Sequence, residues 1–296
     1  VLRILDRDKG IVPLDALGLA PDQRAALDRI LARPEGLILV VGPTGSGKTT
    51  TLYSMLGHLN TEAVNIMTLE DPVEYPLALI RQTQVGEASR LDFADGVRAL
   101  LRQDPDVILI GEIRDADTAT MALRAALTGH QVFATLHANS VFGALPRLVE
   151  IGLAPELLAG NLTGVLSQRL VRRLCPSCRA PGPATADELA RLGLPASATP
   201  PELYHAVGCP SCDFRGYRGR LAITEILPID TELDELVARR AHTAELRAAA
   251  QRKGFRSLAE DGVRRVLDGS TSLRELARVI DLSPLSAPTR MASACA

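Results

Sequence analysis

The feature that most constrains this chain is the run from Gly42 to Thr49, which reads GPTGSGKT and matches G-x-x-x-x-G-K-[ST] at every fixed position. A short apolar run over residues 37–41 precedes it, and a helical pattern over residues 48–59 follows it. Glycines allow the backbone to curl so that successive N–H groups face an anion, and the N-terminus of the next helix adds positive charge. A strand, this loop and a helix in that order predict a nucleoside triphosphate site.

The motif also assigns individual roles. Lys48 is expected to reach the β- and γ-phosphates and to stabilise charge during catalysis, and the Thr49 hydroxyl is expected to ligate Mg²⁺. ATP and Mg²⁺ are therefore the predicted ligands of this loop. The residues expected to bind the nucleotide are Gly42, Pro43, Thr44, Gly45, Ser46, Gly47, Lys48, Thr49 and Thr50.

Apolar strands alternate with helical patterns over the first half of the chain. This alternation is typical of βαβ units around a parallel sheet. The expected strands are 37–41, 64–69, 80–85, 107–110 and 132–136, and the expected helices are 48–59, 93–101 and 116–127. Asp92 stands where it can cap the second of these helices.

The pattern changes from about Pro155. A helix is expected to run from there towards Arg172, and residues 175–217 are rich in Pro, Gly and Cys with little periodicity. A strand is expected over 220–227, followed by helices over 231–240, 243–253, 257–268 and 272–280.

Acidic residues follow two of the predicted strands. Glu112 comes directly after the strand 107–110, and Glu70, Asp71 and Glu74 follow the strand 64–69. In open α/β sheets ligands bind at the carboxyl ends of the strands, so these carboxylates are expected to reach the nucleotide. Hydrolysis requires an acid near magnesium and a group that orients water. The spacing leaves open whether Glu70 or Glu112 orients the water.

Two histidines bracket the strand 132–136. His137 is expected to emerge at its carboxyl end, where it can contact the γ-phosphate, so we predict a functional role for it. His130 lies at the opposite end of the same strand, where a structural hydrogen bond is as well supported as a functional one.

Two Cys-x-x-Cys pairs predict a metal site. Cys175 and Cys178 form the first pair, and Cys209 and Cys212 form the second. Four thiolates on two such turns complete a tetrahedral site, for which zinc is the default metal and a structural role is favoured. A redox pair, reduced thiols and a four-cysteine iron–sulfur cluster are the alternatives.

Composition limits the class of protein. The net charge is −2, and the chain has no Trp and only 3% aromatic residues, which disfavours a strongly basic nucleic-acid binder and base stacking. No apolar run reaches the roughly 18 residues of a membrane span, and no signal peptide is recognised at the start. We therefore expect a soluble chain made in the cytosol, and we expect no nucleic acid among its partners.

Four segments resemble the secretion ATPase superfamily of bacterial type II secretion and type IV pilus assembly. They are TGSGKTTTLY, TLEDPVEY, LLRQDPDVILIGEIRDADTA and ALTGHQVFATLHANS, in this order, and the resemblance covers roughly residues 30–280. It implies that residues 42–49 are the Walker A loop and that Glu112 belongs to the Walker B motif. It likewise places Glu70, Asp71 and Glu74 in an aspartate box, and His130 and His137 in a histidine box.

The resemblance implies a fold and a division of the chain. The predicted class is α/β, with a RecA-like P-loop NTPase core, a zinc-binding insertion and a helical C-terminal region. Residues 1–30 are expected to be the linker from a missing N-terminal domain, to which the initial Val1 also points. The other expected parts are the ATPase core (31–172), the tetracysteine insertion (173–217), the helical region (218–282) and a disordered tail (283–296) that includes Cys295.

The resemblance also implies a function and partners. It implies a homohexameric ATPase at the cytoplasmic face of the inner membrane, held there peripherally by platform proteins, with acidic phospholipid as a further possible partner. Arg102, Arg114 and Arg169 are candidates to act across a subunit interface, although a surface or structural role is favoured for each.

The tetracysteine element resembles that of type II secretion ATPases and of many pilus extension ATPases, so a motor for pseudopilus assembly is predicted and a pilus extension ATPase is the alternative. Rivals of other classes are a RecA-like nucleic-acid translocase and a zinc-bearing adaptor that binds ATP without turnover.

Overall fold

The computed structural model describes residues 12–86 and 91–283. The expected tail after Ser283, including Cys295, and the first eleven residues of the expected linker lie outside the described residues. The chain divides by its contacts into two compact units. The first comprises residues 1–168 and 224–255, and the second comprises residues 169–223 and 256–296.

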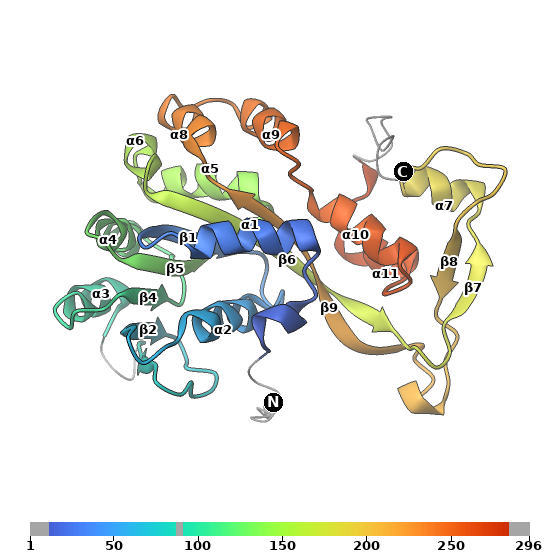
Figure 1. Cartoon of the computed structure of the whole chain (residues 1–296), viewed down its shortest axis with the longest axis horizontal. Helices are drawn as coiled ribbons and strands as arrows, with labels where there is room; N and C mark the ends of the chain where they lie inside the picture. Colours follow the sequence, from blue (N-terminus) through green and yellow to red (C-terminus); the bar gives the residue numbers. More distant parts are fainter. Residues whose placement is uncertain (1–11, 87–90, 284–296) are drawn as a thin grey trace. The chain divides into compact units, whose positions relative to one another are not determined.

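A mostly parallel sheet forms the centre of the first unit (Figure 1). Within the described residues it has seven strands in the order β3 (Arg81–Gln84), β2 (Ile66–Glu70), β4 (Val107–Ile110), β5 (Gln131–Leu136), β1 (Gly36–Val41), β6 (Leu162–Leu174) and β9 (Tyr217–Pro228). The strand β1 pairs in parallel with both β5 and β6, β4 pairs in parallel with β5 and β2, and β2 pairs in parallel with β3. The carboxyl ends of β1, β2, β4 and β5 consequently meet at one edge of the sheet.

Helices cover both faces of this sheet because the side chains of a strand alternate between faces. Leu37, Leu39 and Val41 of β1 belong to a core with α3, α4, α5, α8 and α9, whereas Ile38 and Val40 belong to a second core with α1 and α2. The helical segments of this unit are η2 (Leu14–Leu17), α1 (Pro21–Leu31), α2 (Lys48–Leu59), α3 (Phe93–Leu100), α4 (Ala116–Leu127), α5 (Val141–Ile151), α6 (Pro155–Leu158), α8 (Thr231–Ala238) and α9 (Thr243–Arg252).

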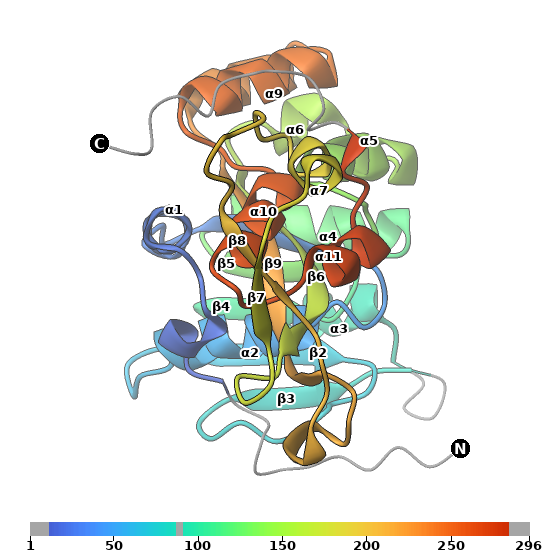
Figure 2. The same cartoon turned by 90° about the vertical axis from the view of Figure 1, so that its right-hand side faces the viewer.

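The second unit has a core of its own. It contains the second half of β6, from residue 169, and the first half of β9, up to residue 223. Its other elements are an antiparallel pair β7 (Ala180–Pro183) and β8 (Glu202–His205), α7 (Ala186–Arg191), η3 (Pro210–Cys212), α10 (Leu258–Leu267) and α11 (Leu273–Val279). Figure 2 shows β7 and β8 in front of α10, and α10 contacts β8. Val171, Leu203, Ile223 and Leu276 are buried together here, so strands and helices from distant parts of the sequence share one apolar cluster.

The structure confirms most of the predicted elements and corrects one. The helix α2 has the predicted bounds, and Asp92 caps α3 by accepting a hydrogen bond from the Asp95 N–H at 2.7 Å. The expected helix towards Arg172 is wrong, because residues 162–174 form the strand β6. Leucine-rich segments suit helices, but the first half of β6 is buried beside β1, so it lacks the alternation that marks a strand exposed on one face. Residues 175–217 also contain β7, α7 and β8.

No helix of the described ranges is both long enough and apolar enough to cross a membrane.

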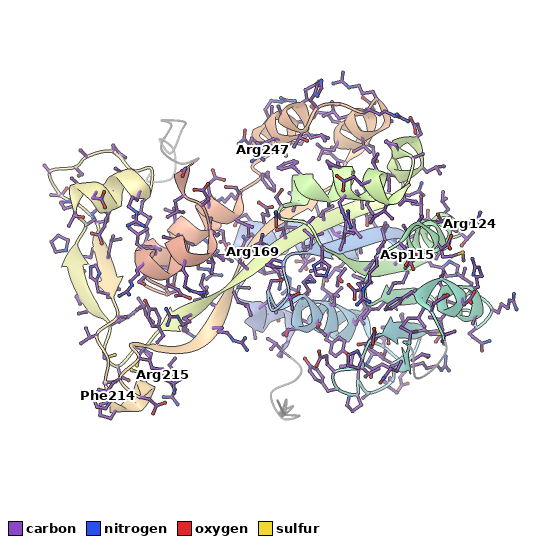
Figure 3. The ribbon with its side chains drawn as sticks, turned by 180° about the vertical axis from the view of Figure 1, so that it is seen from behind. Asp115, Arg124, Arg169, Phe214, Arg215 and Arg247 are labelled. Carbon is purple, nitrogen blue, oxygen red and sulfur yellow. The ribbon has the colours of Figure 1, made fainter. Side chains whose placement is uncertain are left out.

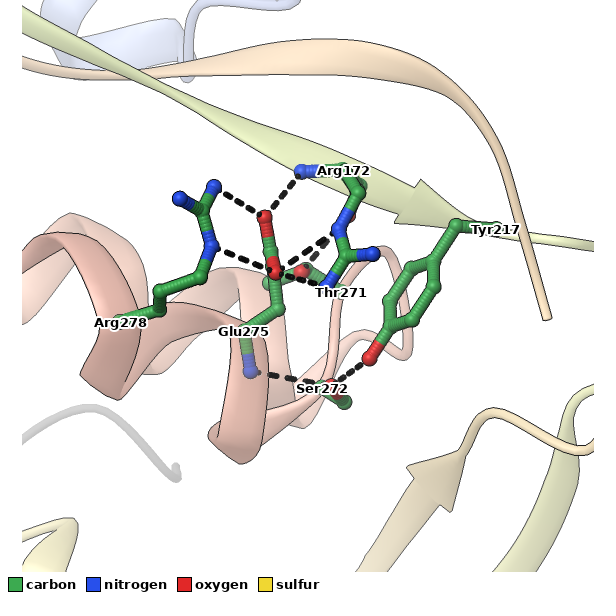
Figure 4. A network of polar contacts seen from close by, with 6 residues as sticks. All are labelled: Arg172, Tyr217, Thr271, Ser272, Glu275 and Arg278. Carbon is green, nitrogen blue, oxygen red and sulfur yellow. Dashed lines mark hydrogen bonds and ion pairs between the residues drawn. The ribbon is translucent and has the colours of Figure 1, made fainter. Parts of the chain in front are cut away.

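A buried carboxylate ties together three parts of the second unit (Figure 4). The Glu275 side chain is fully buried and accepts hydrogen bonds from Nη2 of Arg172 at 2.6 Å and from Nη2 of Arg278 at 2.9 Å. The Arg172 guanidinium also lies over the ring of Tyr217, 4.2 Å from its centroid. Burial disfavours the charged carboxylate, but the hydrogen bonds from Arg278 and Arg172 outweigh this and lower the pKa of Glu275 to about 2.

We predict that Glu275→Gln lowers the free energy of unfolding of the second unit by about 2 kcal/mol near neutral pH, because hydrogen bonds to a charged group are lost. A carboxyl with a lowered pKa stabilises the fold above its ordinary pKa of 4.5, and this contribution disappears as the pH falls towards about 2. The difference in the free energy of unfolding between wild type and Glu275→Gln should therefore become smaller as the pH falls below 4.5. Urea unfolding at several pH values, followed by hydrogen exchange in α10 and α11, measures it.

Glu202→Gln is the matched control, since Glu202 is an exposed carboxylate of the same unit. A gap for Glu275→Gln that is as wide at pH 3 as at pH 7 would contradict the assigned cause.

Candidate functional site

The loop between β1 and α2 has the backbone geometry of an anion cradle. Gly45 and Gly47 have φ values of 76° and 90°, a left-handed conformation that glycine adopts without the cost that a Cβ would bring. Gly47 is the N-cap of α2, and no side chain caps that helix end. The N–H groups of the first turn have no acceptor within the helix, so they can bind an anion.

Side chains of Gln168 and Lys48 form hydrogen bonds to carbonyls of the loop, and residues 43–45 stay exposed. The amide of Gln168, on β6, donates from Nε2 to the carbonyl of Ser46 at 2.8 Å. Lys48 folds over the loop, where its Nζ donates to the carbonyls of Gly42 at 2.9 Å and Pro43 at 3.1 Å. Ser46 is buried, and its hydroxyl finds no hydrogen-bond partner within the described part of the chain.

The remaining predicted loop residues lie where a ligand can reach them. Pro43, Thr44 and Gly45 are exposed, and Thr49 and Thr50 are half-buried in the first turn of α2. An accessible loop with an uncapped helix end and an unpartnered buried hydroxyl fits a bound triphosphate. The donor set of this loop, with Thr49 beside Lys48, also fits a magnesium–nucleotide complex.

The structure brings Glu112 and His137 together beside this loop. Both follow the carboxyl ends of strands, β4 and β5, that are paired in the sheet next to β1. His137 Nε2 lies 3.5 Å from Glu112 Oε2, and the other carboxylate oxygen pairs with Arg114. The Glu112 side chain is only 17% exposed, whereas His137 is 54% exposed, so the carboxylate is sheltered and the imidazole faces outwards.

Glu70 occupies a different environment from Glu112. It ends β2 and is buried, with three hydrogen-bond donors around its carboxylate. The Tyr53 hydroxyl donates to Oε2, while Thr68 Oγ1 and Gln82 Nε2 donate to Oε1 at 2.6 and 3.0 Å. Burial and the hydrogen bond to Glu70 raise the pKa of Tyr53, so this donor stays protonated at neutral pH.

The residues that hold Glu70 are not evident from sequence patterns. Tyr53 lies on α2, Gln82 on β3 and Thr68 two residues before Glu70 on the same strand. Gln82 also accepts a hydrogen bond from the Leu77 N–H at 2.7 Å, so it fixes the loop after β2 as well. The alternating pattern of residues 80–85 is the sequence signal that could have pointed to an inward-facing Gln82.

Arg114 and Asp71 are the other acidic and basic candidates that lie near Glu112. The hydrogen bond with Glu112, together with the negative charges of Glu112 and Asp71, raises the pKa of Arg114, so Asp71 lies near this pair. Asp71 is exposed and Glu74 is half-buried in the loop that follows β2. Arg102 is exposed after α3, and Arg169 is half-buried on β6.

His130 lies at the opposite edge of the sheet from His137. Its Nδ1 is 2.9 Å from the carbonyl of Ala125 and 3.2 Å from the hydroxyl of Thr128, and its own carbonyl accepts a hydrogen bond from the Gly36 N–H at 3.0 Å. These contacts connect the end of α4 to the start of β1. The geometry thus gives His130 a structural place away from the phosphate loop.

The four cysteines of the two pairs converge in the second unit. Their sulfur atoms all lie within 4.8 Å of one another. Cys175 Sγ is 3.9 Å from Cys209 Sγ, and Cys212 Sγ is 3.8 Å from the Sγ atoms of Cys178 and Cys209. Disulfide sulfurs would be about 2.05 Å apart, so these are free thiols. Four sulfurs placed tetrahedrally at about 2.3 Å from Zn²⁺ lie about 3.8 Å from each other, and the cluster fits this spacing.

Backbone donors surround the cysteine cluster. The N–H groups of Gly208, Cys209 and Gly216 each lie 3.3 Å from a cysteine sulfur. The hydrogen bond from the Ser211 hydroxyl at 2.9 Å lowers the pKa of Cys209 to about 6, whereas desolvation raises that of Cys178 to about 11. Donors aimed at sulfur stabilise thiolates, which are the form that binds metal.

Comparison with known proteins places the chain in a family. Residues 1–278 match the family described as "Type II/IV secretion system protein". The chain belongs to this family.

Two relatives within this secretion family are similar to nearly the whole of this chain. It is 48% identical over 279 residues to the type II secretion system protein E of Pseudomonas aeruginosa, and the matched region covers 94% of this chain and 55% of that protein. It is 45% identical over 284 residues to the type IV pilus assembly ATPase TfpB of Acinetobacter baylyi, which covers 96% of this chain and 48% of that protein. The chain spans about half the length of these relatives.

A solved structure supports the fold of this secretion-family chain. The crystal structure of the pilus retraction motor PilT with bound ADP matches with a TM-score of 0.68 and 29% identity, covering 92% of this chain and 68% of that one. The predicted α/β class with a P-loop core is therefore confirmed.

For this secretion-family chain we predict that the purified protein holds about one zinc ion and that Cys212→Ser removes it. Loss of the metal should destabilise the second unit, because the cluster closes its loops. Metal analysis and hydrogen exchange measure both effects, and ATP affinity should stay within about twofold. Cys295→Ser, which removes the cysteine that belongs to neither Cys-x-x-Cys pair, is the control. Full metal content in Cys212→Ser would contradict a four-cysteine site.

Proposed function

We propose that this chain is the ATP-hydrolysing part of a motor that drives type II protein secretion by assembling a pseudopilus. The observation that carries the proposal is the placement of the phosphate loop, Glu112 and His137 at one edge of the sheet. The P. aeruginosa relative named type II secretion system protein E supports the choice of secretion system.

The loop residues 42–50 would bind ATP through their backbone N–H groups. Lys48 would leave its carbonyl partners at Gly42 and Pro43 and turn to the β- and γ-phosphates. Thr49 would ligate Mg²⁺, which when bound neutralises charge on the phosphates. These groups stabilise the negative charge that develops as water attacks the γ-phosphorus.

Glu112 is the residue that we assign to orient the attacking water. It is sheltered and lies at the strand end beside β5, whereas the oxygens of Glu70 are already occupied by Tyr53, Thr68 and Gln82. Glu70 then acts as a positioning residue that connects α2 to the loop after β2. His137 Nε2 lies 3.5 Å from Glu112 Oε2. His137 would contact the γ-phosphate, and its contact with Glu112 would then change when the γ-phosphate is bound.

Assembly and location belong to the same proposal. We propose a homohexamer bound peripherally to the cytoplasmic face of the inner membrane through platform proteins, with zinc as a structural ion in the second unit. Type IV pilus extension is the second candidate, because the relative TfpB is nearly as similar as the type II secretion proteins. Stimulation of turnover by a platform protein supports either of these, and stimulation by DNA would instead support a translocase.

We predict that Glu112→Gln lowers kcat for ATP hydrolysis by about 10²–10⁴-fold and leaves the Kd for ATP within about threefold, because the carboxylate acts on water and not on the bound phosphates. Turnover is measured on the assembled oligomer, and affinity by calorimetry.

Glu150→Gln serves as the control, since Glu150 is an exposed carboxylate on α5 that pairs with Arg147. Equal and negligible turnover of wild type and Glu112→Gln in assembled rings would support the adaptor and contradict the motor.

A further inference from the structure

A cavity of about 520 Å³ lies within the second unit, and none of its lining residues is among those assigned to ATP. Its walls come from β6, α7, β8, the start of β9 and the residues around the start of α11, so every wall belongs to the same unit. Cavities of about 300–1,000 Å³ are typical of sites for small molecules. Nothing in the ATPase proposal uses this one.

Arginines dominate the lining of this cavity. Arg172, Arg191, Arg215 and Arg274 all contribute to it, against a single acidic residue, Glu188. The Glu188 carboxylate is already engaged at the start of α7, where Oε2 accepts hydrogen bonds from the N–H and the hydroxyl of Thr185 at 2.9 and 3.0 Å. Arg172 and Arg215 pair with acids outside the lining, Glu275 and Asp213, whereas Arg191 and Arg274 form no ion pair within the described part of the chain.

The sequence of the second unit has the same bias. Residues 169–223 and 256–296 contain fourteen arginines, nine acidic residues and no lysine, although the whole chain has a net charge of −2. Arginine without lysine favours recognition of planar or tetrahedral oxyanions, because the guanidinium offers a fixed fork of donors.

One wall of the cavity is held rigid by the network in Figure 4. Nε and Nη2 of Arg172 both donate to Glu275, at 2.9 and 2.6 Å, and the guanidinium stacks on Tyr217. The Tyr217 hydroxyl lies 2.7 Å from Ser272 Oγ. Glu275 is shared with Arg278, so one carboxylate faces two guanidinium groups and the cluster keeps a net positive charge. Arg172 thus presents charge to the cavity without the entropy cost of ordering a mobile side chain.

A second aromatic residue also lines the cavity. Tyr204, on β8, has the Arg179 guanidinium 4.5 Å from its ring centroid, and Arg179 in turn donates to the carbonyl of Gly269 at 2.6 Å. Arg215 follows the second cysteine pair, next to Phe214, as Figure 3 shows. The cavity therefore combines charged forks with flat ring surfaces.

We propose that this cavity binds a small organic phosphate, as a second anion site independent of the phosphate loop. Guanidinium groups bind phosphate through paired, charge-assisted hydrogen bonds, and several arginines around one cavity suit a ligand with more than one negative charge. The tyrosine rings suit a ligand that also carries a flat or apolar part.

The test uses pyrophosphate and AMP as probes of the full chain. Calorimetry gives the affinity, and hydrogen exchange locates the binding, with protection expected in residues 186–206 and 270–275 of the wild type. Arg191→Ala combined with Arg274→Ala should weaken this binding by about tenfold or more, since each substitution removes a charge-assisted hydrogen bond. Both side chains are exposed, so the fold should tolerate the changes.

Arg218→Ala combined with Arg220→Ala is the matched control, because it removes two exposed arginines of the same unit that do not line the cavity. It should change the affinity less than about twofold, by general electrostatics alone. Equal weakening by both double variants, or protection confined to residues 42–52, would overturn the proposal. So would binding of anionic phospholipid vesicles, but of neither soluble probe, through Arg191 and Arg274.

Discussion

The parallel pairing of β1 with β5, and of β5 with β4, is the constraint on which the rest of the nucleotide site depends. Parallel strands deliver their carboxyl ends to one edge, so the phosphate loop, His137 and Glu112 meet although they lie far apart in the sequence. The helices α2, α3 and α4 form the connections from β1 to β2, from β3 to β4 and from β4 to β5, and they bury both faces of the sheet. The same packing makes the strands nearly fully buried, which gives the edge a rigid base.

Two carboxylates at this edge differ through their surroundings. Glu70 is enclosed by neutral donors and connects α2, β2 and β3, whereas Glu112 is held by charged or chargeable groups, Arg114 and His137. A carboxylate whose partners are solvent-exposed side chains can exchange those partners for a ligand when one binds. A fully bonded, buried one costs much more to move. This contrast, and not sequence spacing, separates the positioning role proposed for Glu70 from the catalytic role proposed for Glu112.

Much of the core was predictable because its elements have a clear period. The bounds of α2, α4 and β4 follow from apolar spacing. The two Cys-x-x-Cys pairs predicted that the four cysteines lie together, as they do in the structure. The strand β6 was not predictable, since a buried central strand and a leucine-rich helix have similar apolar content. The cage around Glu70 was missed because Tyr53 and Gln82 approach it only through the tertiary fold. The basic cavity of the second unit was missed for the same reason: its arginines are scattered over residues 172–274 and have no motif.

The most direct test of the account is a structure of the chain with Mg²⁺ and a non-hydrolysable ATP analogue. We predict that the backbone of residues 42–49 surrounds the phosphates, that Thr49 contacts the ion, and that Glu112 has left Arg114 to face a water beside the γ-phosphate. Phosphates bound elsewhere, or Glu112 still paired with Arg114 and far from the γ-phosphate, would contradict the account.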